Sequence, residues 1–436
     1  MVSADNVNYD VWELVFAYLN GPDLAAVTSV SRSFWACALP LLYRTLPFQN
    51  AQAKGYPRVK TPFAVLRSRP SYAIFARIVD IRAVPLSNPR AQKAGPELGF
   101  LADAHFAVAS ALNLTSFTCT APSAIPSFLV PLQKKERLQH LRIHADLTVD
   151  MASELVKIDH LRSLVLDRAS CWVLDVLPQW AEAMKNTLRQ LTIFSSPVAN
   201  PCVLAQTVER LPKLLGLHVV QCPNIPHAEV FALADHTPKL QSLACTVIGS
   251  SRSLPQVSFT ELKHLALDIP GRCPPTSPLP TPITIPHSLT NILPLTRFTH
   301  LSSLAVFSNI SEPLDDSALD GLLHVHGPSL RCLRLQGVSL DPDDIRNIAA
   351  QCTNLEKLLV PIPVDDMDEF IGALSHSESL RTLVDASVNG AHSHRVSLTN
   401  EPVRDLMGEV ESLRRVISQN RFWTVRYLLS IVNLLP

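Results

Sequence analysis

The stretch LRCLRLQGVSLDPDDIRNIAAQCTNLEKLLV, residues 330–360, decides the fold. It begins and ends with the same phrase, LxxLxL, once from Leu330 and again from Leu355. The LxL alternation is typical of a short strand with every second side chain inward, and the leucine three positions earlier fills the same core. Between the two phrases, Asp341 is a suitable helix N-cap and Pro342 a suitable first helical residue. The stretch therefore predicts a strand, a helix and the next strand.

The phrase is repeated along most of the chain. Its starts are separated by 22 to 29 residues, apart from one interval of 39 residues. Two further segments, IPHAEVFALADH and DDMDEFIGALSHS, have apolar residues three and four apart, as amphipathic helices do. One strand and one helix per repeat, stacked in parallel, predict an α/β protein with a curved solenoid. The ten phrases start at Leu138, Leu161, Leu188, Leu214, Leu240, Leu262, Leu301, Leu330, Leu355 and Leu380.

The pattern resembles the leucine-rich repeat family over roughly residues 110 to 400. The long interval holds PGRCPPTSPLPTPITIP, and because proline supplies no ladder donor, a loop extruded between repeats is predicted at 270–288. Three flanking segments look like worn copies that act as caps: LTSFTC from Leu114, RIVDIRAV near Ile78 and LRRVIS from Leu413. The predicted solenoid occupies residues 111–400, after a connecting segment with worn repeats at 48–110 and before a C-terminal cap at 401–436.

Composition limits the possible functions. Of 436 residues, 47% are hydrophobic and 17% charged, which favours a folded chain, and the 38 acidic and 38 basic residues cancel. This balance, without a long basic run, predicts neither nucleic acid nor membrane as a partner. The first twenty residues lack the basic start of a signal peptide, and no apolar run reaches membrane-spanning length. We therefore expect a soluble cytoplasmic or nuclear protein whose nine scattered cysteines are reduced.

No catalytic motif is found. The thirteen glycines form neither a GxGxxG fingerprint nor a phosphate loop, and no GxSxG elbow is present. His324 and His326 form one HxH pair, and His392 and His394 form another, but neither has a third ligand at metal spacing. We interpret both pairs as surface histidines. The sequence predicts no enzyme activity, no cofactor and no metal.

The segment before the repeats, residues 8 to 46, is unusually apolar. We expect a first helix near residues 10–19, with a core stripe formed by Val11, Leu14, Val15 and Tyr18. Gly21-Pro22-Asp23 should end that helix and start a second, and Ser31 should cap a third. About forty residues lie near the limit for a self-sufficient core, so another chain or the repeats must cover some of these side chains.

The run VNYDVWELVFAYLNGPDLAAVTSVSRSFWACALPLLYRTL resembles the F-box, and its closing ALPLLYRTL resembles the version that precedes degenerate leucine-rich repeats in many fungal proteins. Val7 and Asn8 depart from the usual Leu-Pro opening. The resemblance implies a helical F-box domain at residues 5–47 that docks on a Skp adaptor and through it on a cullin. The positions that match the motif, and that are implied to bind the adaptor, are Trp12, Val15, Leu24, Val27, Val30, Ser31, Arg32 and Trp35.

F-box proteins are substrate receptors of Skp/cullin/F-box ubiquitin ligases, so the resemblance implies that the repeats hold a target protein. The residues beside the strand leucines should face the concave surface, and aromatic and basic side chains are enriched at hot spots. Two alternatives stay open: a leucine-rich-repeat scaffold whose N-terminal helices only cap the solenoid, and an F-box protein that acts outside any ligase. The predicted target-binding residues are Arg142, Phe194, His218, Phe307 and Arg334.

Overall fold

The computed structural model describes residues 8–19, 21–87, 95–248, 259–270, 292, 300–313, 316–386, 398–419 and 421–424. The predicted loop at 270–288 lies outside the described residues, apart from its first residue, as do His392 and His394. The chain forms two compact units, residues 1–214 (unit 1) and 215–436 (unit 2). We describe each unit separately.

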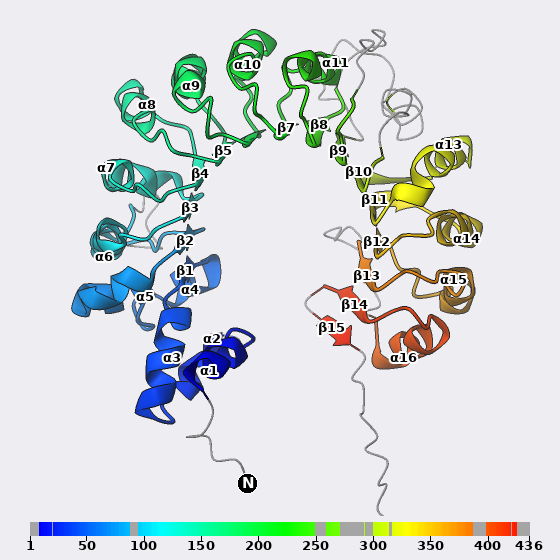
Figure 1. Ribbon diagram of the computed structural model, residues 1–436, viewed down its shortest axis with the longest axis horizontal. Helices are drawn as coiled ribbons and strands as arrows, with labels where there is room; N and C mark the ends of the chain where they lie inside the picture. Colours follow the sequence, from blue (N-terminus) through cyan, green and yellow to red (C-terminus); the bar gives the residue numbers. More distant parts are fainter. Residues whose placement is uncertain are drawn as a thin grey trace, which may run out of the picture. The chain divides into compact units, whose positions relative to one another are not determined.

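Unit 1 begins with three short helices, which we call the helical head: α1 (Tyr9–Phe16), α2 (Gly21–Val27) and α3 (Arg32–Leu42). The sequence predicted how α3 begins: the side chain of Ser31 accepts a hydrogen bond from the backbone N–H of Phe34 at 3.1 Å. Only two residues separate α3 from the first strand, so the head lies directly beside the first repeat (Figure 1).

Six strands of unit 1 lie side by side in chain order, and every neighbouring pair is parallel. The helices that connect them lie on the other side of the strands (Figure 1). Strands form at both worn copies in this unit, near Ile78 and after Leu114. The strands are β1 (Thr45–Phe48), β2 (Ile78–Ile81), β3 (Ser116–Cys119), β4 (His140–His144), β5 (Ser163–Asp167) and β6 (Gln190–Phe194). The helices are α4 (Asn50–Gly55), α5 (Pro62–Ser68), η2 (Pro70–Phe75), α6 (Leu98–Ser110), η3 (Pro122–Ser127), α7 (Leu129–Gln133), α8 (Val149–Leu155), α9 (Cys171–Ala183) and α10 (Pro201–Val208).

Unit 2 repeats the same arrangement. Its strands β7 to β14 pair in parallel, and β15 returns antiparallel beside β14. The strands are β7 (Gly216–Val220), β8 (Ser242–Thr246), β9 (His264–Ile269), β10 (Ser303–Pro313), β11 (Cys332–Ser339), β12 (Lys357–Val360), β13 (Thr382–Asp385), β14 (Arg415–Ser418) and β15 (Arg421–Thr424). The helices are α11 (His227–Ala232), η4 (Leu233–His236), α13 (Asp316–His326), η5 (Gly327–Ser329), α14 (Pro342–Gln351), α15 (Met367–Leu374) and α16 (Asn400–Glu409).

The leucines of the repeated phrase form the core. In the repeat quoted first, Leu330, Leu333 and Leu335 are all fully buried between strand and helix. The following helix begins as predicted: Asp341 accepts from the N–H of Asp344 at 2.8 Å, and Pro342 is the first helical residue. The predicted fold class, an α/β leucine-rich repeat protein with one parallel strand and one helix per repeat, is confirmed.

The last two strands of unit 1, β5 and β6, each end in a tight turn. Arg168 and Ser195, which directly follow β5 and β6, take the left-handed backbone conformation, with φ of 55° and 53°. The next residue, Ala169 or Ser196, is buried, and Ser196 Oγ donates to the carbonyl of Ala169 at 2.8 Å. A small side chain at this position lets the chain turn from the strand toward the helix side.

Candidate partner-binding surfaces

The helical head has a small core of its own. Phe16 and Leu24 are buried, and Cys37 on α3 closes the cluster. The rings of Trp12 and Phe34 pack on it, with centroids 4.6 Å apart. The aromatic contacts join α1 to α3, and Leu24 adds α2 to the same core, so three helices that are each too short to be stable alone hold together.

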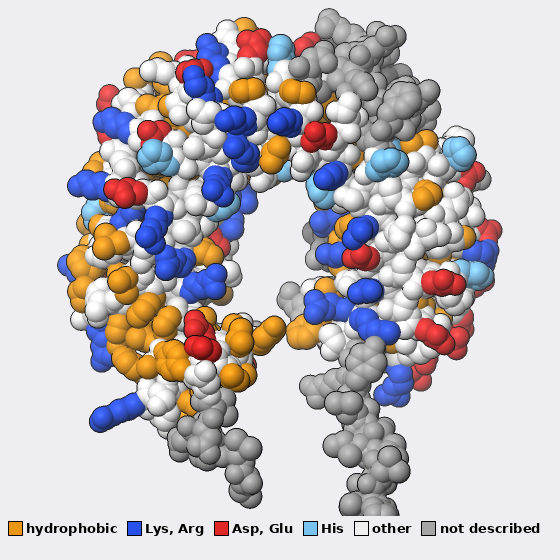
Figure 2. Space-filling model, viewed as in Figure 1, with side chains coloured by type: hydrophobic (Ala, Val, Ile, Leu, Met, Phe, Trp, Pro, Cys, Tyr) orange, Lys and Arg blue, Asp and Glu red, His pale blue; other side chains and the backbone are white. Residues whose placement is uncertain are grey.

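The other stripe of α1 faces solvent, and here the sequence prediction was wrong. The predicted core stripe of Val11, Leu14, Val15 and Tyr18 is 44%, 65%, 46% and 89% exposed. The reason is that the large rings one position along the helix, on Trp12 and Phe16, fill the space between the three short helices better. We call the exposed side chains of Val11, Leu14 and Val15 on α1, together with Tyr18 in the turn that follows, the outer face of α1. Figure 2 shows hydrophobic side chains gathering over this end of unit 1.

The structure divides the predicted adaptor-binding residues into two groups. Leu24 is buried, and Trp12 and Val27 pack against the head core, so these three maintain the head. Val15, Val30, Arg32 and Trp35 lie at the surface, and Ser31 is also exposed while it caps α3. Sequence reasoning assigned Val11, Leu14 and Tyr18 to the core, and their i, i+3, i+7 spacing on an exposed helix was the signal for a contact surface.

An aromatic junction joins the head to the first repeats. The ring of Tyr72, in η2, lies 6.3 Å from that of Trp35 and 5.2 Å from that of Tyr43. Arg69 Nη1 donates to the Tyr72 hydroxyl at 2.7 Å. Burial raises the pKa of Tyr43 above its usual value, which is consistent with a packed junction. Trp35 therefore contacts the repeats with part of its ring and keeps 41% of its surface exposed.

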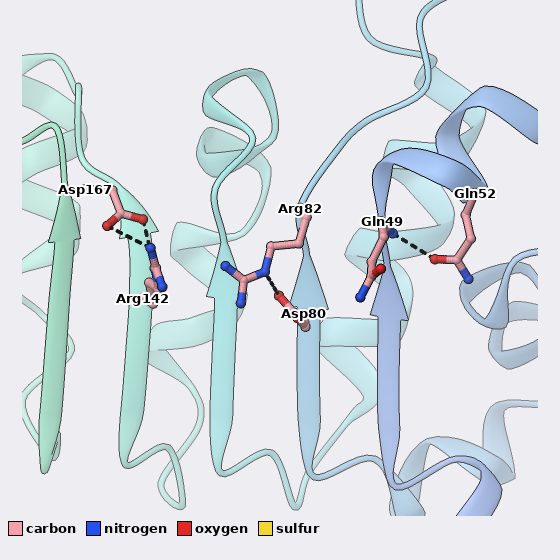
Figure 3. A network of polar contacts seen from close by, with 6 residues as sticks. All are labelled: Gln49, Gln52, Asp80, Arg82, Arg142 and Asp167. Carbon is pink, nitrogen blue, oxygen red and sulfur yellow. Dashed lines mark hydrogen bonds and ion pairs between the residues drawn. The ribbon is translucent and has the colours of Figure 1, made fainter. Parts of the chain in front are cut away.

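On the strand face of unit 1, the predicted hot-spot arginine is already paired. Arg142 on β4 makes two hydrogen bonds to the carboxylate of Asp167 on β5, at 2.9 and 3.3 Å (Figure 3). Arg82 and Asp80 form a second ion pair at 2.6 Å, near β2. A bidentate pair fixes the guanidinium plane, so Arg142 is held in one orientation. Phe194, at the end of β6, is half-buried.

On the strand face of unit 2, Phe307 and Arg334 form one feature. The Arg334 guanidinium lies 4.6 Å from the centroid of the Phe307 ring, and its Nη2 donates to Gln336 Oε1 at 3.2 Å. Further along, His218 Nε2 is 2.9 Å from Ser242 Oγ. Burial, and then the neighbouring His264, lower the pKa of His218, which favours the neutral imidazole.

The strand-end loops of unit 1 enclose a groove that sequence reasoning missed. Its volume is about 580 Å³, and its walls include Trp172, Arg168 and Val198. Trp172 and Val198 are 49% and 46% exposed. The lining residues come from the segments after four different strands, β3 to β6, so no local pattern in the sequence indicates the groove.

Within the described residues, no group of three or more His, Cys, Asp or Glu side chains has the geometry of a metal site. The described helices also include none that is long and apolar enough to cross a bilayer. The prediction for His324 and His326 was half wrong: His324 is exposed, but His326 is fully buried at the end of α13.

No model of a known protein family matches the chain, and no curated protein matches its sequence. Solved structures that are similar to it include the following three. The yeast Rad7 and Elc1 complex matches with 14% identity and a TM-score of 0.42, over 66% of this chain and 81% of that chain. The TLR13–ssRNA13 complex matches with 17% identity and a TM-score of 0.38, over 72% of this chain and 41% of that chain. The leucine-rich repeat-containing protein LegL7 from Legionella pneumophila matches with 12% identity and a TM-score of 0.34, over 84% of this chain and 96% of that chain. With every TM-score below 0.5, these likenesses assign no partner or activity to the chain.

Proposed function

We propose that this protein is the target-recognition subunit of a Skp/cullin/F-box ubiquitin ligase and acts in the cytoplasm or nucleus. The single observation that carries the proposal is the outer face of α1. It presents three large apolar side chains on one side of α1 and Tyr18 in the turn that follows, in a segment that resembles the F-box. The chain itself performs no chemistry in this role, since it holds a target near an enzyme carried by other subunits.

The energetics favour a partner on this face. Burying a Val or Leu side chain fully stabilises a complex by roughly 1.5 to 3 kcal/mol. Leu14 and Tyr18 are 65% and 89% exposed, so most of the free energy of burying them is still available to a complex. Val30 is a further apolar side chain that is 65% exposed. A contiguous exposed apolar patch of this kind is typical of a protein interface. Asp10 and Glu13, both exposed on the same helix, supply the polar rim that such interfaces have.

The strand faces supply surfaces on which a target can be held. Arg142 and Arg334 are each fixed by a neighbour, by Asp167 in one case and by Phe307 in the other. A side chain fixed before binding loses less conformational entropy when the target arrives. Both arginines are only part-buried, so donor groups remain within reach of a partner.

The test is binding of a purified Skp adaptor to the full chain and to surface variants. We expect Leu14→Asp to abolish binding, because it introduces a charge at the centre of the outer face without disturbing the head core. Leu112→Asp is the matched control: Leu112 is 71% exposed in the same unit but away from the head, and this variant should bind as the unchanged protein does. Leu24→Asp is a poor test, because Leu24 is buried and the head would unfold.

The two alternatives predict different results in the same assay. A scaffold whose helices only cap the repeats would show no adaptor binding by the unchanged protein. An F-box protein outside any ligase would bind the adaptor, and addition of purified cullin would not yield a complex of three proteins. Recovery of that complex, lost with Leu14→Asp, is the result that supports the ligase role.

A further inference from the structure

A regular row of residues lies at the start of the strands of unit 1. We call the residues directly before β1 to β6 the strand-start row. Hydrogen bonds fix the backbone of these residues, because in every row residue before the last the carbonyl accepts two backbone N–H groups from the next repeat. The carbonyl of Arg162, for example, accepts from the N–H of Arg189 at 2.8 Å and from that of Gln190 at 3.0 Å. The backbones of neighbouring residues in the row are therefore separated by the strand spacing, about 4.8 Å. The row consists of Arg44, Arg77, Thr115, Gln139, Arg162 and Arg189.

Four of these six side chains are arginines, and none of the four has an ion pair with a described residue. Arg189 Nη1 donates only to the neutral carbonyl of Leu188. Arg137 lies two residues before Gln139 and so, in chain order, between the two arginine pairs; its Nη1 donates to the amide oxygen of Asn113 at 2.8 Å. Figure 2 shows Lys and Arg side chains over these repeats.

Acidic residues are few in the loops that carry the row. Glu136 is exposed, and Asp159 lies with its Oδ1 3.2 Å from His160 Nε2. Neither forms an ion pair with an arginine of the row among the described residues. The charges of the whole chain cancel, so this positive edge results from where the fold places its arginines and not from overall charge.

The same position in unit 2 gives an internal comparison. There Arg331 is followed in the next repeat by Glu356, and the two side chains form an ion pair at 3.4 Å, whereas the two repeats after that place Arg381 and Arg414 at this position. In unit 1, Arg44 is followed by Arg77, and Arg162 by Arg189. Like charges on adjacent strands repel each other, so both pairs lower the stability of the free protein. Elsewhere in unit 1, arginines such as Arg67 are paired with carboxylates.

We propose that the strand-start row of unit 1 binds a segment of the target protein that is rich in Asp and Glu. The inference rests on the proposed function, since it names the class of target that the repeats recognise. Guanidinium groups bind carboxylates through paired, charge-assisted hydrogen bonds, and a bound acidic segment relieves the repulsion within the row. Within each arginine pair the backbones are about 4.8 Å apart, which is less than the Debye length of about 8 Å at physiological salt. Salt therefore does not fully screen the positive charge that each pair presents to a ligand.

A protein segment fits better than a nucleic acid. Single-stranded nucleic acids bind where aromatic side chains offer stacking platforms beside the basic groups. The residues next to the row, at the first position of each strand, carry no Phe, Tyr or Trp; they are Thr45, Ile78, Ser116, His140, Ser163 and Gln190. Hydroxyl and amide groups in this set are suited to the backbone of an extended peptide.

The experiment measures binding of a labelled peptide of alternating Glu and Ser to the full chain by fluorescence anisotropy. We expect binding that weakens as salt is raised, and no binding of the same peptide with Gln in place of Glu. The double variant Arg162→Glu, Arg189→Glu should lower the affinity about tenfold or more, a loss of about 1.4 kcal/mol. The matched control, Arg331→Glu with Arg381→Glu, makes the same charge change at the same position in unit 2 and should change the affinity by less than about twofold, or about 0.4 kcal/mol.

Three results would overturn the proposal: no binding of the acidic peptide at low salt, an equal loss in both double variants, or tighter binding of a single-stranded oligonucleotide through the same arginines. Circular dichroism checks that each variant is folded. If the first double variant does not fold, Arg44→Gln with Arg77→Gln replaces it, with the same expected direction. Adaptor binding is measured separately on the same proteins. Its absence would count against the ligase role, whereas loss of peptide binding alone would count only against the acidic target.

Discussion

His326 shows how one polar side chain is accommodated inside the repeat core. It is fully buried at the end of α13, although the sequence suggested a surface position beside His324. Burial, and then the neighbouring His300, lower its pKa to about 4. The HxH pattern could not reveal this, because the last turn of α13 places alternate residues on opposite sides of the helix.

His326 makes stability depend on pH. Its pKa is about 6.5 in the unfolded chain and about 4 in the folded one, so between these values the unfolded chain binds more protons. The free energy of unfolding should therefore fall as the pH falls from 6.5 to 4, by roughly 2 to 3 kcal/mol from this residue. Urea titration at a series of pH values measures the slope. His326→Gln should flatten it, and His376→Gln, at an exposed histidine, should not. An unchanged slope in the first variant would contradict the assignment.

At the scale of elements, α1 shows where sequence reasoning succeeds and where it fails. Its helical pattern was predictable, and so were the cap at Ser31 and the strand and helix of each repeat, because these depend on residues close in sequence. Which of its two apolar stripes turns inward was not predictable. That choice depends on the ring of Phe34, which belongs to another helix and packs on Trp12. For the same reason, the pairing of Arg142 with Asp167, 25 residues away, was not visible in the sequence.

The aromatic junction between the head and the repeats gives a prediction at this scale. Removing the ring with Tyr72→Ala deletes its contacts with Trp35 and Tyr43, and each aromatic pair contributes about 0.5 to 1.5 kcal/mol. Amide hydrogen exchange in α3 should become faster, by up to about tenfold for each 1.4 kcal/mol by which the free energy of local opening falls. Adaptor binding should persist, because the outer face of α1 is unchanged.

The control for this variant is Tyr56→Ala, which removes an edge-to-face contact with Phe100 in the repeats and not at the junction. Exchange in α3 should be as slow in this variant as in the unchanged protein. Equal acceleration in both variants would mean that the head does not depend on Tyr72.

At the scale of the whole molecule, function depends on surfaces rather than on a catalytic centre. The core leucines were readable from the sequence because they follow a period. The distribution of charge was not, since 38 acidic and 38 basic residues indicate only neutrality. Folding brings Arg162 and Arg189 together at the strand starts and leaves Arg331 beside Glu356. A neutral chain thus acquires a row of strand starts without an acidic residue in unit 1, whereas in unit 2 the same position includes one acidic residue, Glu356.

The central claim is that a Skp adaptor covers the outer face of α1, and hydroxyl-radical footprinting of the full chain with and without the adaptor tests it most directly. Leu14 and Tyr18 should be oxidised readily in the free protein and become protected when the adaptor is present. Leu98 and Leu112, which are 75% and 71% exposed elsewhere in unit 1, should be oxidised equally in both samples. Oxidation of Leu14 and Tyr18 at the same rate with a saturating amount of adaptor would contradict the account.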